Sequence, residues 1–167
     1  MSRTFGLFSL ALLFGLAGCP SYWHSPLLGI PVGPSGPPSL LAVTPDPSPS
    51  TVLRVTAKDS VGEKQFQWVL IPMSMPTGSI TAVQLCYQIV TAKPGSTYIS
   101  QTRLTRTTVP ASALVIHDDP TNLTSTTPVC YVSKAGTEVA GTTTLALKMV
   151  FGSPDDAIRI GGIELRR

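Results

Sequence analysis

The chain has 167 residues, which accommodates one domain with short appendages. Hydrophobic residues make up 43% of it, enough for a buried core, whereas charged residues make up only 13%, about half the usual share. The formal net charge is +3 and the basic residues are scattered singly, so no nucleic-acid partner is expected.

The first 18 residues have the organisation of an export signal. Arg3 supplies a positive charge, and an uncharged apolar segment follows from Phe5 to Gly18. A helix that spans a bilayer needs roughly 20 apolar residues, whereas this shorter segment has the length of the apolar region of a secretory signal. We therefore expect residues 1–18 to be a signal peptide.

The apolar segment ends in Leu16-Ala17-Gly18-Cys19. These four residues resemble the lipobox of bacterial lipoproteins, which is Leu, a small residue, Gly or Ala, and then Cys. The resemblance implies that the Cys19 thiol carries a diacylglycerol, that the signal is cleaved just before it, and that the lipid holds the protein at a membrane of the cell envelope. The residue after the lipidated cysteine influences sorting between the inner and the outer membrane in many bacteria that have both, and proline is uncommon there. Pro20 therefore leaves undetermined which of the two membranes holds the protein. The alternative is an ordinary signal peptide with a chance cysteine.

Residues 19–50 are rich in proline. They include nine of the 16 prolines, one acidic residue and no Lys or Arg. Because proline fixes φ and lacks a backbone donor, neither a helix nor a central strand is expected, and the composition predicts a semi-extended tether between lipid and domain. Within it, Tyr22, Trp23, Leu27 and Leu28 are apolar. They either lie at the lipid interface or pack on the domain.

From Thr51 onward, short runs of β-branched and aromatic residues alternate with turn signals. The pattern predicts an all-β domain over 51–167, an antiparallel β-sandwich with the jelly roll as a candidate topology. No named family is assigned to this domain. The eight expected strands are 52–57, 65–71, 80–90, 97–106, 113–117, 129–133, 143–151 and 157–165.

The alternation within these runs predicts which side chains face the core. In 65–71, Phe66, Trp68 and Leu70 share one face, and we assign that face to the core. The alternative for Trp68 is an exposed platform for a sugar ring. In 157–165 the alternation slips at two consecutive glycines, which indicates a β-bulge.

Three cysteines leave one unpaired in an exported protein. If Cys19 carries lipid, Cys86 and Cys130 remain as an even pair in a compartment where disulfides persist. We therefore predict a Cys86–Cys130 disulfide. Two buried free thiols are the alternative.

The only cluster of potential metal ligands is His117-Asp118-Asp119, which could hold Ca²⁺. Adjacent residues of a strand point to opposite faces, so we interpret the cluster as the start of a loop and expect no metal site. His117 is also the domain's only candidate base, and no serine lies in a GxSxG turn. We expect no enzyme activity, and no cofactor other than the covalent lipid.

The sequence thus predicts a non-catalytic, lipid-anchored envelope lipoprotein. It would present a β-sandwich for structural, adhesive or protein-binding contacts, with membrane lipid bound through Cys19. The alternative is a membrane-tethered carbohydrate-binding module. An exposed aromatic platform or a calcium ion in a loop would favour that alternative.

Overall fold

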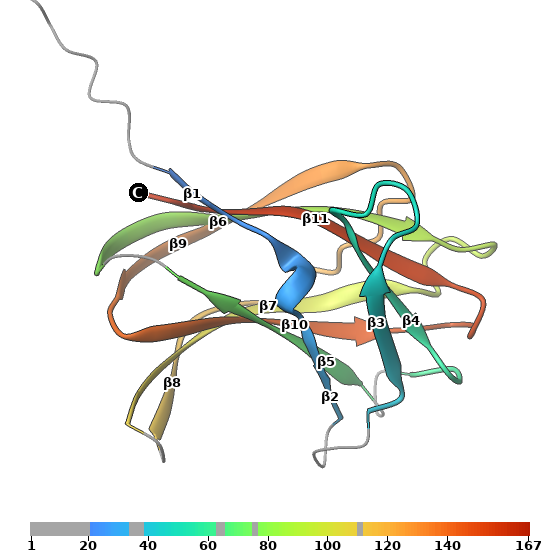
Figure 1. Cartoon of the computed structure of the whole chain (residues 1–167), viewed down its shortest axis with the longest axis horizontal. Helices are drawn as coiled ribbons and strands as arrows, with labels where there is room; N and C mark the ends of the chain where they lie inside the picture. Colours follow the sequence, from blue (N-terminus) through green and yellow to red (C-terminus); the bar gives the residue numbers. More distant parts are fainter. Residues whose placement is uncertain (1–20, 34–38, 63–65, 75–76, 110–111) are drawn as a thin grey trace, which may run out of the picture.

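The computed structural model describes residues 21–33, 39–62, 66–74, 77–109 and 112–167. In this part of the chain, two antiparallel sheets stack face to face as a β-sandwich (Figure 1). The described residues contain no helix that is both long and apolar enough to cross a bilayer. The expected fold class, an antiparallel β-sandwich, is confirmed.

One sheet has six strands in the order β3-β4-β11-β6-β9, and β1 pairs with β11 beside this path. All its pairings are antiparallel. Its strands are β1 (Ser21–His24), β3 (Leu41–Pro45), β4 (Leu53–Ala57), β6 (Gly78–Val90), β9 (Val129–Val139) and β11 (Ala157–Arg166).

The second sheet has five strands in the order β2-β5-β10-β7-β8, again antiparallel throughout. A short 3-10 helix, η1 (Pro26–Leu28), leads into it from β1. Its strands are β2 (Ile30–Val32), β5 (Gln67–Met73), β7 (Tyr98–Val109), β8 (Ser112–Asp119) and β10 (Thr142–Val150).

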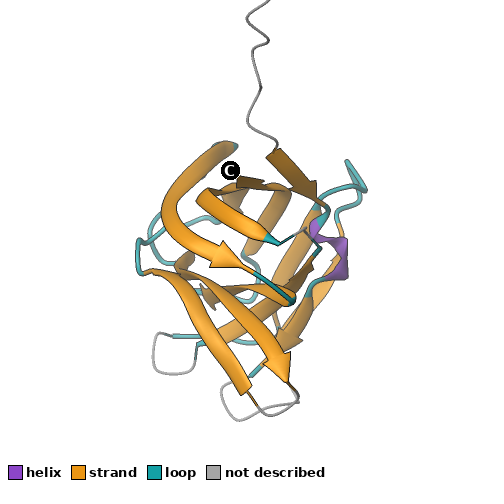
Figure 2. Ribbon diagram, turned by 90° about the vertical axis from the view of Figure 1, so that its left-hand side faces the viewer, coloured by secondary structure: helices purple, strands orange, loops and turns teal. Residues whose placement is uncertain are grey.

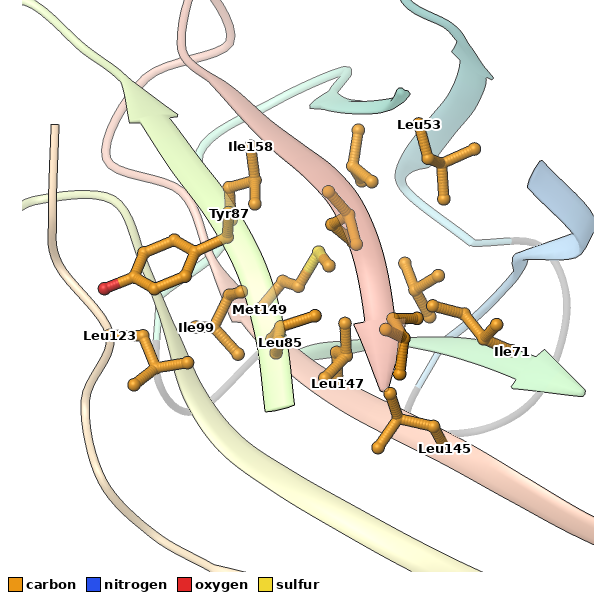
Figure 3. Packing of buried hydrophobic residues seen from close by; sticks show 14 of the residues in the cluster. Leu53, Ile71, Leu85, Tyr87, Ile99, Leu123, Leu145, Leu147, Met149 and Ile158 are labelled. Atoms are coloured by element: carbon orange, nitrogen blue, oxygen red, sulfur yellow. The ribbon is translucent and has the colours of Figure 1, made fainter. Parts of the chain in front are cut away.

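The core lies between the two sheets and is filled by side chains from alternate positions of the long strands (Figure 3). Leu85 of β6 and Leu147 of β10 are 1% and 0% exposed. The same alternation continues along β11 because the register shifts between Ile160 and Ile163, so both side chains are buried. This shift is the predicted β-bulge, which returns the second half of the strand to the core.

The eight strands expected after residue 51 are all present, with some ends moved by a few residues. The tether expected over 19–50 is wrong for the described residues, because β1, β2 and β3 lie within it. Pro31 and Pro45 lie in β2 and β3, the outermost strands of their sheets, where a missing backbone donor costs little. The sandwich therefore starts at least 30 residues earlier than the expected boundary at 51.

Residues 21–32 form a segment that we call the N-terminal strap. It begins as β1 on the six-stranded sheet, turns through η1 and ends as β2 on the five-stranded sheet. Figure 2 shows the helical turn, in purple, at one rim of the sandwich. The strap thus bridges the two layers at one side.

Candidate functional site

The two faces of β5 are opposite to the sequence prediction. Gln67, Val69 and Ile71 are buried, whereas Trp68 and Leu70 are half-buried on the outer surface. Gln67 is tolerated inside because its Oε1 accepts hydrogen bonds from Ser39 Oγ at 2.8 Å and from the Leu40 amide at 3.1 Å. The apolar pattern predicted the wrong inward face for β5 because the inward-facing Gln67 is polar.

A hollow of about 200 Å³ lies on this outer surface, and we call it the outer groove. It crosses four neighbouring strands, β2, β5, β10 and β7, because their outward residues stand side by side in register. Trp68 is opposite Val32, and Leu70 is opposite Ala146. The groove is lined by Val32, Trp68, Leu70, Arg103, Thr105 and Ala146.

The Trp68 ring is held by neighbours on two sides. Phe66 meets it edge-on, with 6.0 Å between ring centroids and an interplanar angle of 87°. The guanidinium carbon of Arg103 lies 5.2 Å from the Trp68 centroid, and Lys148 Nζ lies 4.0 Å from the Phe66 centroid. Such cation–π and edge contacts restrict the motion of the indole ring, which is half-buried and lines the groove.

Planar polar groups border the groove on the β8 side. Asp118 accepts hydrogen bonds from Arg103 Nε and Nη2 at 3.2 and 3.1 Å, and from Gln101 Nε2 at 2.6 Å. The Arg103 hydrogen bond is the main reason that the pKa of Asp118 lies below its usual value. The carboxylate therefore stays charged at neutral pH and fixes the guanidinium beside the ring.

Asp119, the next residue, points to a different set of partners. Its carboxylate accepts from Tyr131 Oη at 2.8 Å, from the Thr121 amide at 3.0 Å, and from Ser133 Oγ. Partial burial raises the pKa of Asp119, but these hydrogen bonds outweigh it and lower the pKa to about 2. Asp119 thus ties the end of β8 to β9.

The side chains of the candidate Ca²⁺ ligands His117, Asp118 and Asp119 do not converge. Asp118 contacts Arg103 on the outer surface, whereas His117 Nε2 lies 2.8 Å from Ser133 Oγ on the β9 side. No group of three or more His, Cys, Asp or Glu side chains that could hold a metal ion occurs among the described residues.

His117, Ser133 and Asp119 do form a chain of contacts, but in the wrong order for a catalytic triad. The Ser133 hydroxyl donates to Asp119, so His117 faces the oxygen lone pair and donates to it. Ser133 is only 2% exposed. In a catalytic triad the histidine accepts the proton of the serine, whereas here the histidine donates to the serine.

The predicted disulfide between Cys86 and Cys130 is present. The two cysteines are directly opposite in the β6–β9 ladder, with their Cα atoms 3.9 Å apart. A second hollow, of about 340 Å³, lies beside this bridge. Its lining includes Arg159, which donates to Asp46 at 2.8 Å and to Gln88 at 3.4 Å. Its aromatic residue, Tyr87, is only 7% exposed, whereas Trp68 of the outer groove is half-buried.

Comparison with solved structures shows the sandwich fold and does not by itself assign a ligand. No family model and no curated protein matches the sequence. A family 29 carbohydrate-binding module complexed with cellulohexaose has a similar structure, with a TM-score of 0.50 and 7% identity over 87% of this chain and 91% of that one. Another variant of that family gives 0.47 at 8% identity, over 88% of this chain and 92% of that one. The Arthrobacter globiformis T6 isomalto-dextranase complexed with panose gives a TM-score of 0.45 at 16% identity, over 87% of this chain and 23% of that one.

Trp68 was considered as a sugar platform from the sequence, but Arg103, Gln101 and Lys148 were not. No local signal marks them, because they reach Trp68 only through cross-strand pairing: Lys148 is opposite Trp68 and also opposite Gln101. Cys19 lies outside the described residues, so its lipid remains a prediction.

Proposed function

We propose that this protein is a non-catalytic glycan-binding module held at a membrane of the bacterial cell envelope by lipid on Cys19. The observation that carries the proposal is Trp68, half-buried on an outer sheet face beside an apolar hollow. A pyranose ring has an apolar face of C–H groups and a rim of hydroxyls. An aromatic platform bordered by Arg103, Asp118 and Gln101 complements both parts.

The polar border suits neutral sugar hydroxyls. Arg103 keeps donors beyond the two that Asp118 receives, and the Asp118 carboxylate accepts as well. Hydroxyl groups both donate and accept, so this paired arrangement satisfies them in either role. The likeness to a carbohydrate-binding module that holds cellulohexaose supports the choice of ligand class.

The anchoring half of the proposal depends on the lipobox Leu16-Ala17-Gly18-Cys19. Intact mass of the protein isolated from bacterial membranes tests it, with Cys19→Ala as the control. We expect a chain that starts at Cys19 and carries acyl mass. A chain that starts elsewhere without lipid contradicts the anchor and leaves the glycan site untouched.

The glycan site is tested by titrating cellohexaose, a mannan hexasaccharide and an α-1,6-linked glucan into detergent-solubilised protein, with calorimetric detection. Trp68→Ala should weaken binding of the preferred glycan about 5- to 150-fold, since removing a stacked ring costs about 1–3 kcal/mol. Trp23→Ala is the matched control, because Trp23 is on the strap and does not line the groove. Failure of every glycan to bind, or equal binding by both variants, would refute the site.

A second candidate function is binding to another protein. The β7–β8 hairpin exposes three apolar side chains, Val109, Leu114 and Val115, at 54%, 54% and 45%. Such exposed apolar groups are common in protein interfaces. This candidate predicts that Leu114→Glu abolishes partner capture while glycan binding is unchanged.

A further inference from the structure

The position of β1 removes the spacer between the predicted lipid and the folded domain. Ser21 already pairs with Arg166 of β11, and Cys19 is two residues before it. Two residues of chain span at most about 7 Å. If Cys19 bears lipid, as the proposed function states, the sandwich must lie against the membrane surface.

The strap is the part of the domain that this short connection brings to the membrane. Its exposed residues are two serines, Ser21 and Ser25, and four large apolar residues. Trp23, Leu27, Leu28 and Ile30 are 58%, 41%, 68% and 58% exposed, all within eight residues. We call these four side chains the strap patch. Aromatic and aliphatic side chains of this kind favour the boundary between lipid headgroups and acyl chains.

The patch is held in place although its side chains are open. Pro26, the first residue of η1, is buried, and the Gly29 amide donates to the Pro26 carbonyl at 2.9 Å. A Cβ on Gly162 would lie 2.7 Å from the Trp23 ring, so the indole rests directly on the β11 backbone. A membrane contact through the strap therefore needs little ordering of the chain.

The charges around the patch also suit an anionic membrane. Residues 21–33 contain no Asp, Glu, Lys or Arg. The neighbouring end of β11 has Arg166, paired with Glu164 at 2.9 Å, and Arg167, whose guanidinium lies 5.1 Å from the Tyr22 centroid. Cationic groups beside an apolar patch attract anionic headgroups.

We propose that the strap patch docks into the membrane interface and fixes the orientation of the sandwich on the bilayer. The patch is continuous with the outer groove, because Ile30 is opposite Leu70 and Val32 is opposite Trp68. The groove then opens at the border of the membrane contact. A glycan bound there is held next to the membrane surface instead of at the distance that a long tether would allow.

The test uses the full chain, purified from bacterial membranes and reconstituted into phosphatidylethanolamine–phosphatidylglycerol vesicles with brominated acyl chains, which quench nearby indole emission. The chain has two tryptophans, so Trp68→Phe leaves only Trp23, and Trp23→Phe leaves only Trp68. We expect Trp23 emission to be quenched at least twofold more than Trp68 emission. Equal quenching of the two would overturn the docked orientation.

A second substitution tests the patch itself in the Trp68→Phe background. Leu28→Glu should at least halve the quenching of Trp23, whereas Leu114→Glu, at a position 54% exposed on β8, should leave it unchanged. Unaltered quenching in Leu28→Glu, or a dimer in detergent that protects Trp23 from aqueous iodide, would overturn the proposal.

Failure of the inference and failure of the proposed function give different results. Acylated Cys19 with unquenched Trp23 rejects the docked orientation alone. Absence of acyl mass rejects the anchor and, with it, the orientation. The glycan titration in detergent reports on the groove independently of both.

Discussion

Removal of the Cys86–Cys130 disulfide is the perturbation whose size the structure predicts most directly. The bridge joins residues 44 apart in sequence, so it closes a loop of about 45 residues in the unfolded chain. On the chain-entropy model, a loop of that length contributes about 4 kcal/mol to the free energy of unfolding at 25 °C. Cys86 is half-buried and Cys130 is exposed, so truncating both to Ala removes little core packing.

The Cys86→Ala/Cys130→Ala double variant should therefore unfold about 4 kcal/mol more easily in urea. For a domain of this size, that corresponds to a Tm about 8–16 °C lower. Tris(2-carboxyethyl)phosphine should lower the stability of the native protein by a similar amount and leave the double variant unchanged.

The native secondary structure should survive in the double variant, because Cys86 and Cys130 are also partners in the β6–β9 ladder. A loss of less than about 1 kcal/mol would refute the reasoning. It would mean that the unfolded chain is already restricted between these two positions, so that closing the loop removes little entropy.

Two further predictions concern the end of β8 and the bulge in β11. The hydrogen bonds of Asp119 lower its pKa to about 2, below the unfolded value of 3.8. The ionised carboxylate therefore stabilises the folded state above pH 4, and this stabilisation is lost as the pH falls toward 2. Urea titrations of the native protein and of Asp119→Asn measure this effect as the difference between their unfolding free energies. After allowance for solvent screening of this partly exposed carboxylate, that difference should shrink by about 1 kcal/mol from pH 5 to pH 2. A difference that stays constant with pH would contradict the prediction. In a Trp68→Phe background, Gly162→Ala should push the Trp23 ring off β11 and shift the emission of Trp23. Gly136→Ala is the control and should leave the emission unchanged, because its Cβ would meet nothing within 4 Å. Equal emission spectra in the two variants would refute the contact between Trp23 and Gly162.

The sequence predicted most of the fold because many strands have one apolar and one polar face. In β6, Leu85 and Ile89 alternate with Gln84 and Gln88, which leaves a single choice of inward face. The disulfide partners also followed from the sequence, through the count of cysteines and the lipobox. Lipid on Cys19 remains a prediction.

The candidate site was less predictable because its residues belong to separate strands. Arg103 and Asp118 are 15 residues apart and meet only because β7 and β8 pair. In the run Trp68-Val69-Leu70-Ile71 every residue is apolar, so the alternation rule cannot distinguish the two faces of β5.

By itself, then, the sequence determined the β class, the positions of the later strands along the chain, the bulge at Gly161-Gly162 and the identity of the bridged cysteines. Each of these depends on local patterns or on residue counts. Only the tertiary structure decided that the proline-rich segment is part of the sandwich and that Trp68 faces outward. The physical reason is the same in both cases. A proline-containing edge strand and a strand with two apolar faces are each defined by the strands beside them, and those neighbours are distant in sequence.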